Sequence, residues 1–218
     1  MDPDAEGPSG MQELIPGVLH WKPFNESIGE YVGSHYVDPL DGGGPTLIDS
    51  LLDADGAELP RIAERGAPAR IVLSIGLHRR SIEQLTDEFD CPVMCHRAGA
   101  ARLEDLSVTI EPFEFGDELA PGIIAVAMGA IAPDDTALHI RAGDGALLFG
   151  DGLMRYDGEL GFAPDSLLGD DPESVRREMN GAVRGILDGD IEFDHLLFAH
   201  GEPLVGGGRQ ALRRFLEA

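Results

Sequence analysis

The chain has 218 residues, enough for one domain with a sizeable core, and 43% of them are hydrophobic, as in an ordinary globular protein. It holds no run of about 18 apolar residues, so no segment is suited to spanning a bilayer. Its 40 acidic residues outnumber 16 basic ones and give a formal net charge of −24, which disfavours nucleic acid as a partner.

The acidic residues are scattered along the chain, and Lys22 is the only lysine. This pattern is typical of halophilic proteins, because molar salt shortens the Debye length to about 3 Å and removes most of the self-repulsion. An acidic protein adapted to ordinary salt is the alternative. Residues 1–12 predict a flexible acidic tail before a single domain at 13–218, and the tail lacks the basic and apolar regions of a secretion signal. We therefore expect a cytoplasmic protein.

The N-terminal half predicts strands first and then alternating helices and strands. Residues 14–21 and 33–37 are expected to be strands separated by a polar loop, and a glycine turn at 42–44 precedes a short strand that ends at Asp49. The next predicted elements are a helix at 58–65, a strand at 69–75, a helix at 82–89 capped by Ser81, and a strand at 92–95. This alternation predicts α/β architecture with parallel pairing in this region.

The second half begins with short β-like runs at 108–110, 122–128 and 136–140, followed by a buried strand at 147–152 that ends in a turn. A helix starts at Pro172, and apolar residues at every fourth position mark its buried face: Val175, Met179, Val183 and Leu187. A last strand at 195–199 delivers His200 to its C-terminal end, and residues 210–216 predict a terminal helix.

Three pairs of residues could in principle hold a metal or form a disulfide, but simpler roles are favoured for each. Cys91 and Cys95 are four apart in a predicted strand, about 13 Å from each other and too far for a disulfide, so both are expected to be buried free thiols. The paired acids at 134–135 and 170–171 are expected to form turns or helix N-termini in preference to Ca²⁺ or Mg²⁺ sites.

The order of these elements resembles the metallo-β-lactamase superfamily, and three short segments carry the resemblance. Residues 46–50 (TLIDS), 148–151 (LFGD) and 198–203 (FAHGEP) are similar to the family's early strand ending in Asp, its Gly-Asp strand and its late Gly-His segment. The resemblance covers the chain from about residue 14 to the end. It implies a four-layer αββα sandwich of two mixed β-sheets.

The sequence departs from the family where a His-x-His-x-Asp-His run supplies most metal ligands. The corresponding segment has Ile75 and Leu77 at the first two histidine positions and Arg79 and Arg80 at the Asp and last His positions. Arginine cannot ligate a cation. A further histidine of the family falls near 129–131, where this chain has none, so only Asp151 and His200 of the usual set remain by position.

Two ligands are one too few for a catalytic zinc ion, which generally has three protein ligands and an open position. We therefore expect Asp151 to accept hydrogen bonds from Arg79 or Arg80 in preference to holding a metal. His78 lies one step out of register and is a possible third ligand, although a surface or capping role is favoured.

Two functional hypotheses remain open. In the first, Asp151 and His200 are catalytic and, helped by His78 or His96, hold a single weakly bound divalent metal (zinc, iron or manganese) in a hydrolase that cleaves an ester, a thioester or a similar bond. In the second there is no metal and no catalysis. The cleft, lined by residues that include His78, Arg79, Arg80 and His96, then binds a small anion or a partner; for His96 a structural role is favoured.

Overall fold

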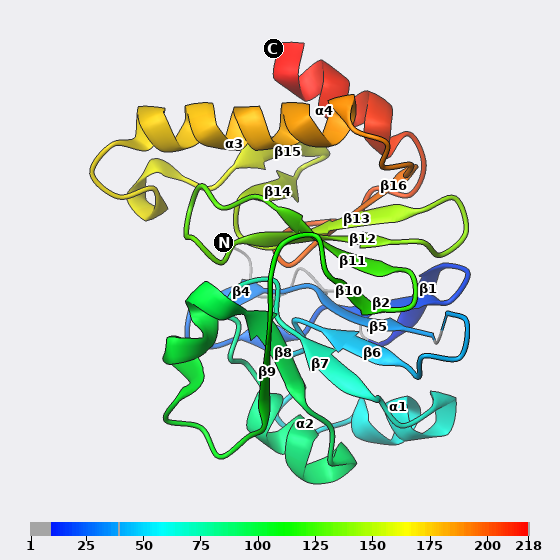
Figure 1. The fold of residues 1–218 in the computed structure, drawn as a ribbon. Coiled ribbons are helices and arrows are strands. Elements are labelled where there is room, and N and C mark those ends of the chain that lie inside the picture. The colour runs from blue at the N-terminus through cyan, green and yellow to red at the C-terminus, as the bar shows by residue number, and fades with distance from the viewer. Residues whose placement is uncertain (1–9, 39, 218) are drawn as a thin grey trace.

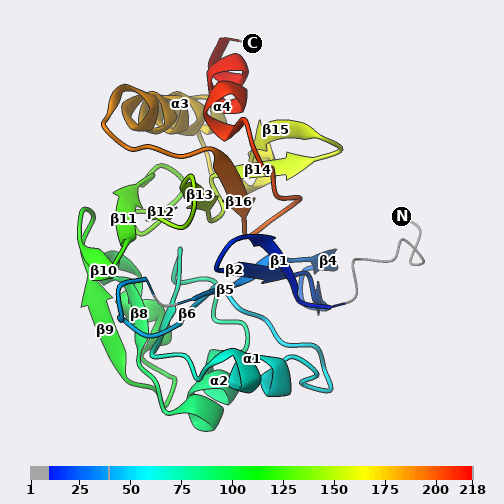
Figure 2. The same ribbon diagram turned by 90° about the vertical axis from the view of Figure 1, so that its right-hand side faces the viewer.

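The computed structural model describes residues 10–38 and 40–217, and its elements form four layers. Two β-sheets face each other, and helices cover both outer faces (Figures 1 and 2). The outer helices are α1 (Leu59–Arg65) and α2 (Ile82–Phe89) on the first sheet, and α3 (Pro172–Asp188) and α4 (Gly208–Glu217) on the second. The predicted αββα sandwich of two mixed sheets is confirmed.

The first sheet has seven strands in the order β1-β2-β5-β6-β7-β8-β9. Its strands are β1 (Gln12–Ile15), β2 (Val18–Trp21), β5 (Ser34–Val37), β6 (Thr46–Ile48), β7 (Arg70–Val72), β8 (Val93–His96) and β9 (Ile110–Phe113). The pairs from β6 to β9 are parallel, as the alternation of strands and helices predicts. The 3-10 helix η1 (Arg97–Leu103) connects β8 to β9.

The second sheet has five strands in the order β10-β11-β12-β13-β16. They are β10 (Glu118–Ala120), β11 (Ile123–Ala127), β12 (Thr136–Ile140), β13 (Ala146–Phe149) and β16 (His195–Phe198). Only β13 and β16 pair in parallel. Two small hairpins complete the β structure: β3 (Phe24–Asn25) with β4 (Glu30–Tyr31), and β14 (Leu153–Tyr156) with β15 (Glu159–Phe162).

Three of the four apolar clusters among the described residues join the layers. The central one joins the inner faces of the two sheets, with Ile48 and Val72 from the first and Leu148 and Leu197 from the second. A second cluster packs the first sheet against α1 and α2, and a third packs β13 and β16 against α3 and α4. Burying these faces supplies the main driving force for folding.

The parallel strands end at the same edge of their sheets, and this fixes where functional side chains gather. Asp49 follows β6, Ser74 and His78 follow β7, Asp151 follows β13 and His200 follows β16. The carboxyl ends of strands in α/β sheets commonly carry binding sites. The central junction between the two sheets is therefore the expected place for a site.

Several local expectations are corrected or confirmed by the structure. Residues 14–21 are two strands and not one, because the turn at Pro16 and Gly17 folds β1 back on β2. Asp171 caps α3 by accepting a hydrogen bond from Ser174 N, as predicted for a helix N-terminus. Ser81 precedes α2, but its side chain accepts a hydrogen bond from Leu52 N and does not cap the helix.

Both cysteines are free and buried, as predicted. No helix in the described part of the chain combines the length and the hydropathy needed to cross a bilayer. Most of the predicted tail lies outside the described residues, and β1 begins at Gln12, within the range assigned to the tail.

Candidate metal centre

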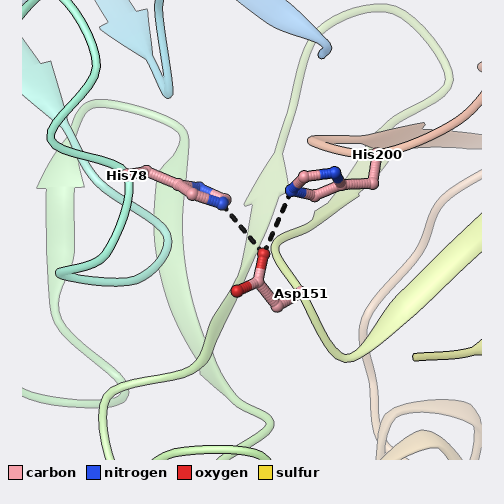
Figure 3. A group of neighbouring side chains, drawn as sticks. All are labelled: His78, Asp151 and His200. Atoms are coloured by element: carbon pink, nitrogen blue, oxygen red, sulfur yellow. Dashed lines mark hydrogen bonds and ion pairs between the residues drawn. The ribbon is translucent and has the colours of Figure 1, made fainter. Parts of the chain in front are cut away.

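Three side chains from three different segments converge between the two sheets. His78 Nε2 lies 2.8 Å from Asp151 Oδ1, and His200 Nε2 lies 3.3 Å from the same oxygen (Figure 3). One donor atom from each residue falls within 4.8 Å of the others. Two imidazoles and one carboxylate with this spacing form a donor set that suits zinc or ferrous iron.

The favoured expectation for His78, a surface or capping role, is wrong. Its side chain is buried and contacts Asp151 through one ring nitrogen and Asp49 through the other. Leu77, the preceding residue, is instead one of the most exposed apolar side chains of the molecule. The loop after β7 therefore turns His78 inward and Leu77 outward, which the register of the family motif does not indicate.

Each imidazole has a second carboxylate behind its other ring nitrogen. His78 Nδ1 lies 3.1 Å from Asp49 Oδ1, and His200 Nδ1 lies 3.7 Å from Glu30 Oε2. A carboxylate on Nδ1 favours the tautomer that carries its proton there and leaves Nε2 free to bind a metal. The contact of His78 with Asp49 is therefore that of a metal ligand with outer support, whereas Glu30 lies beyond hydrogen-bond distance of His200 and acts on it by charge alone.

The sequence marks Asp49 only as the end of an early strand, whereas the structure places it at the centre of the site. It is fully buried and accepts hydrogen bonds from Ser74 N at 2.9 Å and from Ser74 Oγ. Burial by itself would raise its pKa, but His78, Arg80 and Ser74 outweigh burial and lower it to about 2. Asp49 is thus a permanent negative charge beneath the site.

The same charges act on the histidine and on Asp151. Burial and Arg80 oppose a proton on His78, but Asp49 and Asp151 outweigh them and raise its pKa to about 9. Against burial, His78 and His200 hold the pKa of Asp151 far below its usual range. Without a metal, His78 is therefore protonated at neutral pH, and a proton and a metal compete for Nε2.

Neither arginine of the loop pairs with Asp151, which corrects the favoured ion-pair interpretation. Arg79 is half-exposed and contacts Asp105 at 2.8 Å. Arg80 is partly buried and donates to three backbone carbonyls, those of Gly33 at 2.7 Å, of Asp49, and of Ala199 at 3.4 Å. Carbonyl groups at the ends of β6 and β16 and next to β5 accept the hydrogen bonds of this guanidinium group. Asp151 therefore contacts His78 and His200 and not Arg80.

His96 does not line this cleft, which corrects one expectation and agrees with the structural role that was favoured for it. Its ring stacks on Phe115 with the ring centroids 4.1 Å apart, and its Nδ1 accepts a hydrogen bond from Ala98 N. The residues around the cavity come instead from the small hairpins and from the 3-10 helix η2 (Asp165–Leu167).

The acids at 134–135 lie in a turn, as predicted, but both are buried. Asp134 accepts hydrogen bonds from Gly76 N at 2.7 Å and from Arg102 at 2.8 Å. Both carboxylate oxygens of Asp135 lack a hydrogen-bond partner among the described residues. Burial, reinforced by Asp151, raises the pKa of Asp135 to about 7.

The trio opens into a cavity of about 760 Å³. His78, Asp151 and His200 contribute to its wall, together with Glu30, Arg79 and Arg80. The rest of the lining is largely apolar and is contributed by Ile28, Leu51, Leu77, Met154, Tyr156, Pro164 and Leu167. The arrangement is that of a ligand pocket, with a few convergent polar groups inside apolar walls.

Comparisons with known proteins agree with this architecture. No family model and no curated protein matches the sequence. Among solved structures, DIM-1 metallo-β-lactamase matches with a TM-score of 0.70 and 14% identity over 97% of this chain and 99% of that one. The metallo-beta-lactamase family protein TTHA1429 from Thermus thermophilus matches with a TM-score of 0.65 and 16% identity over 94% of this chain and 80% of that one.

A third solved structure, TTHA1623 in a di-iron-bound form, has a TM-score of 0.61 and 23% identity over 83% of this chain and 92% of that one. Identities this low establish the fold alone. The chain has the metallo-β-lactamase fold.

Proposed function

We propose that the chain is a mononuclear metallohydrolase in which His78, Asp151 and His200 hold one divalent ion. The observation that carries this proposal is the convergence of one donor atom from each residue within 4.8 Å. The carboxylates of Asp49 and Glu30 behind the two imidazoles support it. Zinc, iron and manganese are the candidate ions, and the similarity to the di-iron-bound TTHA1623 adds iron to the zinc that this donor set favours.

A single ion is favoured over two because a fixed positive charge already lies beside the trio. Arg80 is partly buried, lines the same cavity and interacts electrostatically with both Asp49 and Asp151. A second divalent cation would be repelled by this guanidinium, whose charge persists at any ordinary pH. The site is therefore depleted relative to a two-metal centre.

The anion-binding alternative has less support, because the guanidinium contacts are already made. Arg80 donates to backbone carbonyls and Arg79 pairs with Asp105. Three carboxylates, those of Asp49, Asp151 and Glu30, also surround the histidines. Their negative charge favours a cation in this position.

When bound, a metal ion of this kind lowers the pKa of its water to about 7 and so provides a nucleophile for hydrolysis. The chain's own residues orient and protect that position. Asp49 fixes the ring of His78, and Arg80 fixes the strand ends beside Asp49 and Ala199. Apolar side chains line most of the cavity beside the trio, and a less polar surrounding strengthens the electrostatic interactions there.

The cavity rim supports an apolar substrate group. The described residues include seven exposed large hydrophobic side chains, and four of these line the cavity: Ile28, Leu77, Tyr156 and Leu167. Such a concentration in a chain with a net charge of −24 indicates a binding surface. We propose a small ester or thioester with an aliphatic or aromatic acyl group as the substrate.

The metal proposal predicts the composition of the purified protein. Protein prepared in molar KCl without chelator or affinity metal should contain close to one equivalent of zinc, iron or manganese by elemental analysis. Asp151→Ala should remove nearly all of it and lower kcat/KM on acyl esters and thioesters by more than about a hundredfold, because a metal loses a direct ligand. His78→Ala should behave in the same way.

Asp105→Ala is the matched control, since Asp105 is an exposed acid that contacts Arg79 without touching the trio. It should keep the metal and the activity. A parent protein that is free of metal, and whose thermal stability is unchanged by EDTA, would contradict the proposal.

The substrate proposal predicts a preference for longer acyl chains. Leu167→Ser should lower the ratio of kcat/KM for a hexanoyl ester to that for an acetyl ester by about tenfold, because burying a few methylene groups is worth about 1–3 kcal/mol. Val205→Ser is the control, as Val205 is similarly exposed but lies outside the cavity. Equal ratios in both variants and in the parent would refute the apolar acyl site.

A further inference from the structure

A second cavity, of about 1060 Å³, lies on the outer helical layer. It is a groove lined by α3, α4 and the β14–β15 hairpin, which lie against one another in Figures 1 and 2. It shares no lining residue with the cavity of the metal centre. The groove therefore stands apart from the proposed hydrolase site.

The charge of this groove is opposite to that of the chain. Four arginines line it (Arg176, Arg177, Arg184 and Arg214), and Glu159 is the only acid that the described residues contribute to its lining. The whole chain has 40 acidic residues and only 16 basic ones. A quarter of the basic residues thus faces one groove, where acidic residues are nearly excluded.

Most of these guanidinium groups have no acidic partner in the described part of the chain. Arg176 pairs with Asp165, and Arg184 donates to the carbonyl of Leu216 at 3.4 Å. The side chains of Arg177 and Arg214 are exposed and make no hydrogen bond or ion pair with any residue in 10–38 or 40–217. Their charge is available to a partner.

The floor of the groove is apolar. Leu160, Phe162, Phe215 and Leu216 are half-buried there, and the rings of Phe162 and Phe215 meet edge to face with centroids 4.8 Å apart. Gly181 lies inside α3 in the groove wall, where an added Cβ would meet nothing within 4 Å. Glycine costs a helix interior about 0.5–1 kcal/mol relative to alanine. Gly181 leaves this part of the groove wall without a side chain, although no close packing in the fold requires a glycine there.

The arrangement of the charges limits which kind of molecule the groove can bind. Arg177 and Arg184 are seven residues apart on α3, about 10 Å along the helix axis, so the guanidinium groups form a row and do not converge on one small anion. A symmetric dimer through this groove would bring the arginines of two copies face to face. A long nucleic acid would be repelled by the net charge of −24.

We propose that this groove binds an acidic segment of a partner protein, with apolar side chains between its carboxylates. The carboxylates pair with Arg177, Arg184 and Arg214 along the rim, and the apolar side chains lie on Phe162 and Phe215. Charge complementarity of this kind sets partner choice and association rate, and the apolar floor contributes to affinity.

The test uses a fluorescein-labelled synthetic peptide of about 15 residues, in which glutamate recurs between leucine and phenylalanine. Fluorescence anisotropy is measured from about 0.2 M to 2 M KCl, because direct ion pairs persist at the short Debye length of molar salt whereas longer-range attraction does not. The parent protein should bind the peptide with an affinity that falls as salt rises. A peptide with lysine in place of glutamate, and one with serine in place of leucine and phenylalanine, should bind at least about tenfold more weakly.

Charge reversal at Arg177, Arg184 or Arg214 to glutamate should weaken binding about three- to tenfold each, since each change replaces an attraction with a repulsion at the rim. Arg213→Glu is the matched control, because Arg213 is an exposed neighbour of Arg214 on α4 outside the groove, and binding should stay within about twofold. Asp151→Ala should bind the peptide like the parent, which separates this proposal from the metal proposal.

Three results would overturn the inference. The first is a parent protein that binds the acidic and the lysine peptides equally or neither of them. The second is an Arg213→Glu variant that loses as much affinity as Arg214→Glu. Binding of phosphatidylserine vesicles that depends on Arg177 while the peptide fails to bind would assign the groove to a membrane surface and would equally reject a protein partner.

Discussion

Replacing Asp49 with alanine should lower the free energy of unfolding by about 3–5 kcal/mol, as expected when one partner of a buried charge network is removed. Asp49 is fully buried, faces His78 and interacts with Arg80, and it accepts two hydrogen bonds from Ser74. Its loss leaves His78 and Arg80 with Asp151 as their remaining counter-charge. Chemical denaturation at pH 7, on metal-free protein, measures the effect.

Asp49→Asn provides the sharper comparison. Asparagine keeps the size of the side chain and one acceptor for Ser74, but it does not stabilise the protonated Nδ1 of His78 by charge. We expect a smaller loss of stability than in Asp49→Ala and a 10- to 100-fold weaker metal affinity, roughly the range for losing an outer-shell partner of a ligand. A metal affinity equal to that of the parent would show that the Asp49–His78 contact does not support a ligand.

Replacing His20 with phenylalanine should remove about 3 kcal/mol of acid destabilisation between pH 6.5 and pH 4. His20 and His35 are cross-strand neighbours on β2 and β5, with ring centroids 4.8 Å apart, and none of their ring nitrogens has a hydrogen-bond partner among the described residues. Burial, with a smaller contribution from Lys22, lowers the pKa of His20 to about 4. Burial and the neighbouring His20 likewise lower the pKa of His35.

The direction of this change in stability with pH follows from proton binding. Below pH 6.5 the unfolded chain binds a proton at position 20, whereas the folded protein stays neutral there until about pH 4, so the parent loses stability as the pH falls through this window. Phenylalanine keeps the ring and has no proton to bind. Urea denaturation at pH 7, 5.5 and 4 should show a shallower pH dependence for the variant. Parallel curves for the two proteins would mean that His20 is not the neutral buried group described here.

The order of elements and the place of Asp151 and His200 follow from the sequence because both depend on short-range patterns. A buried strand that ends in a turn delivers the next side chain to the strand's C-terminal end, and the parallel pairing of β13 and β16 brings the two residues within 3.3 Å. The hydrophobic periodicity that identifies strands and helices acts over a few residues. This periodicity can therefore be recognised in the sequence before the tertiary structure is known.

The orientation of His78 could not be predicted in the same way. The segment after β7 is neither strand nor helix, so no periodicity decides which of its side chains face inward. Asp49, 29 residues earlier, draws His78 in. Backbone carbonyls from three distant segments compete for Arg80 and keep it from Asp151. These contacts are non-local, and a family motif read by register alone places both residues wrongly.

The β14–β15 hairpin, by contrast, could have been predicted from the sequence of its turn. Asp157 and Gly158 sit between two short apolar runs, and both have positive φ, at 51° and 84°. An Asp-Gly pair in this setting is among the strongest short-range indications of a two-residue hairpin turn. The hairpin supplies Met154 and Tyr156 to the cavity of the metal centre.

Arg80 connects the two halves of the molecule through a side chain that is part of the protein itself. Its guanidinium group joins carbonyls of Gly33 and Asp49, in the first half, to that of Ala199, in the second. A metal ion bridging the same halves has to be acquired from solution and can be lost to a stronger chelator. The junction beside the trio is therefore assembled by the chain itself when folding is complete, and the proposed ion would bind as a separate, later event.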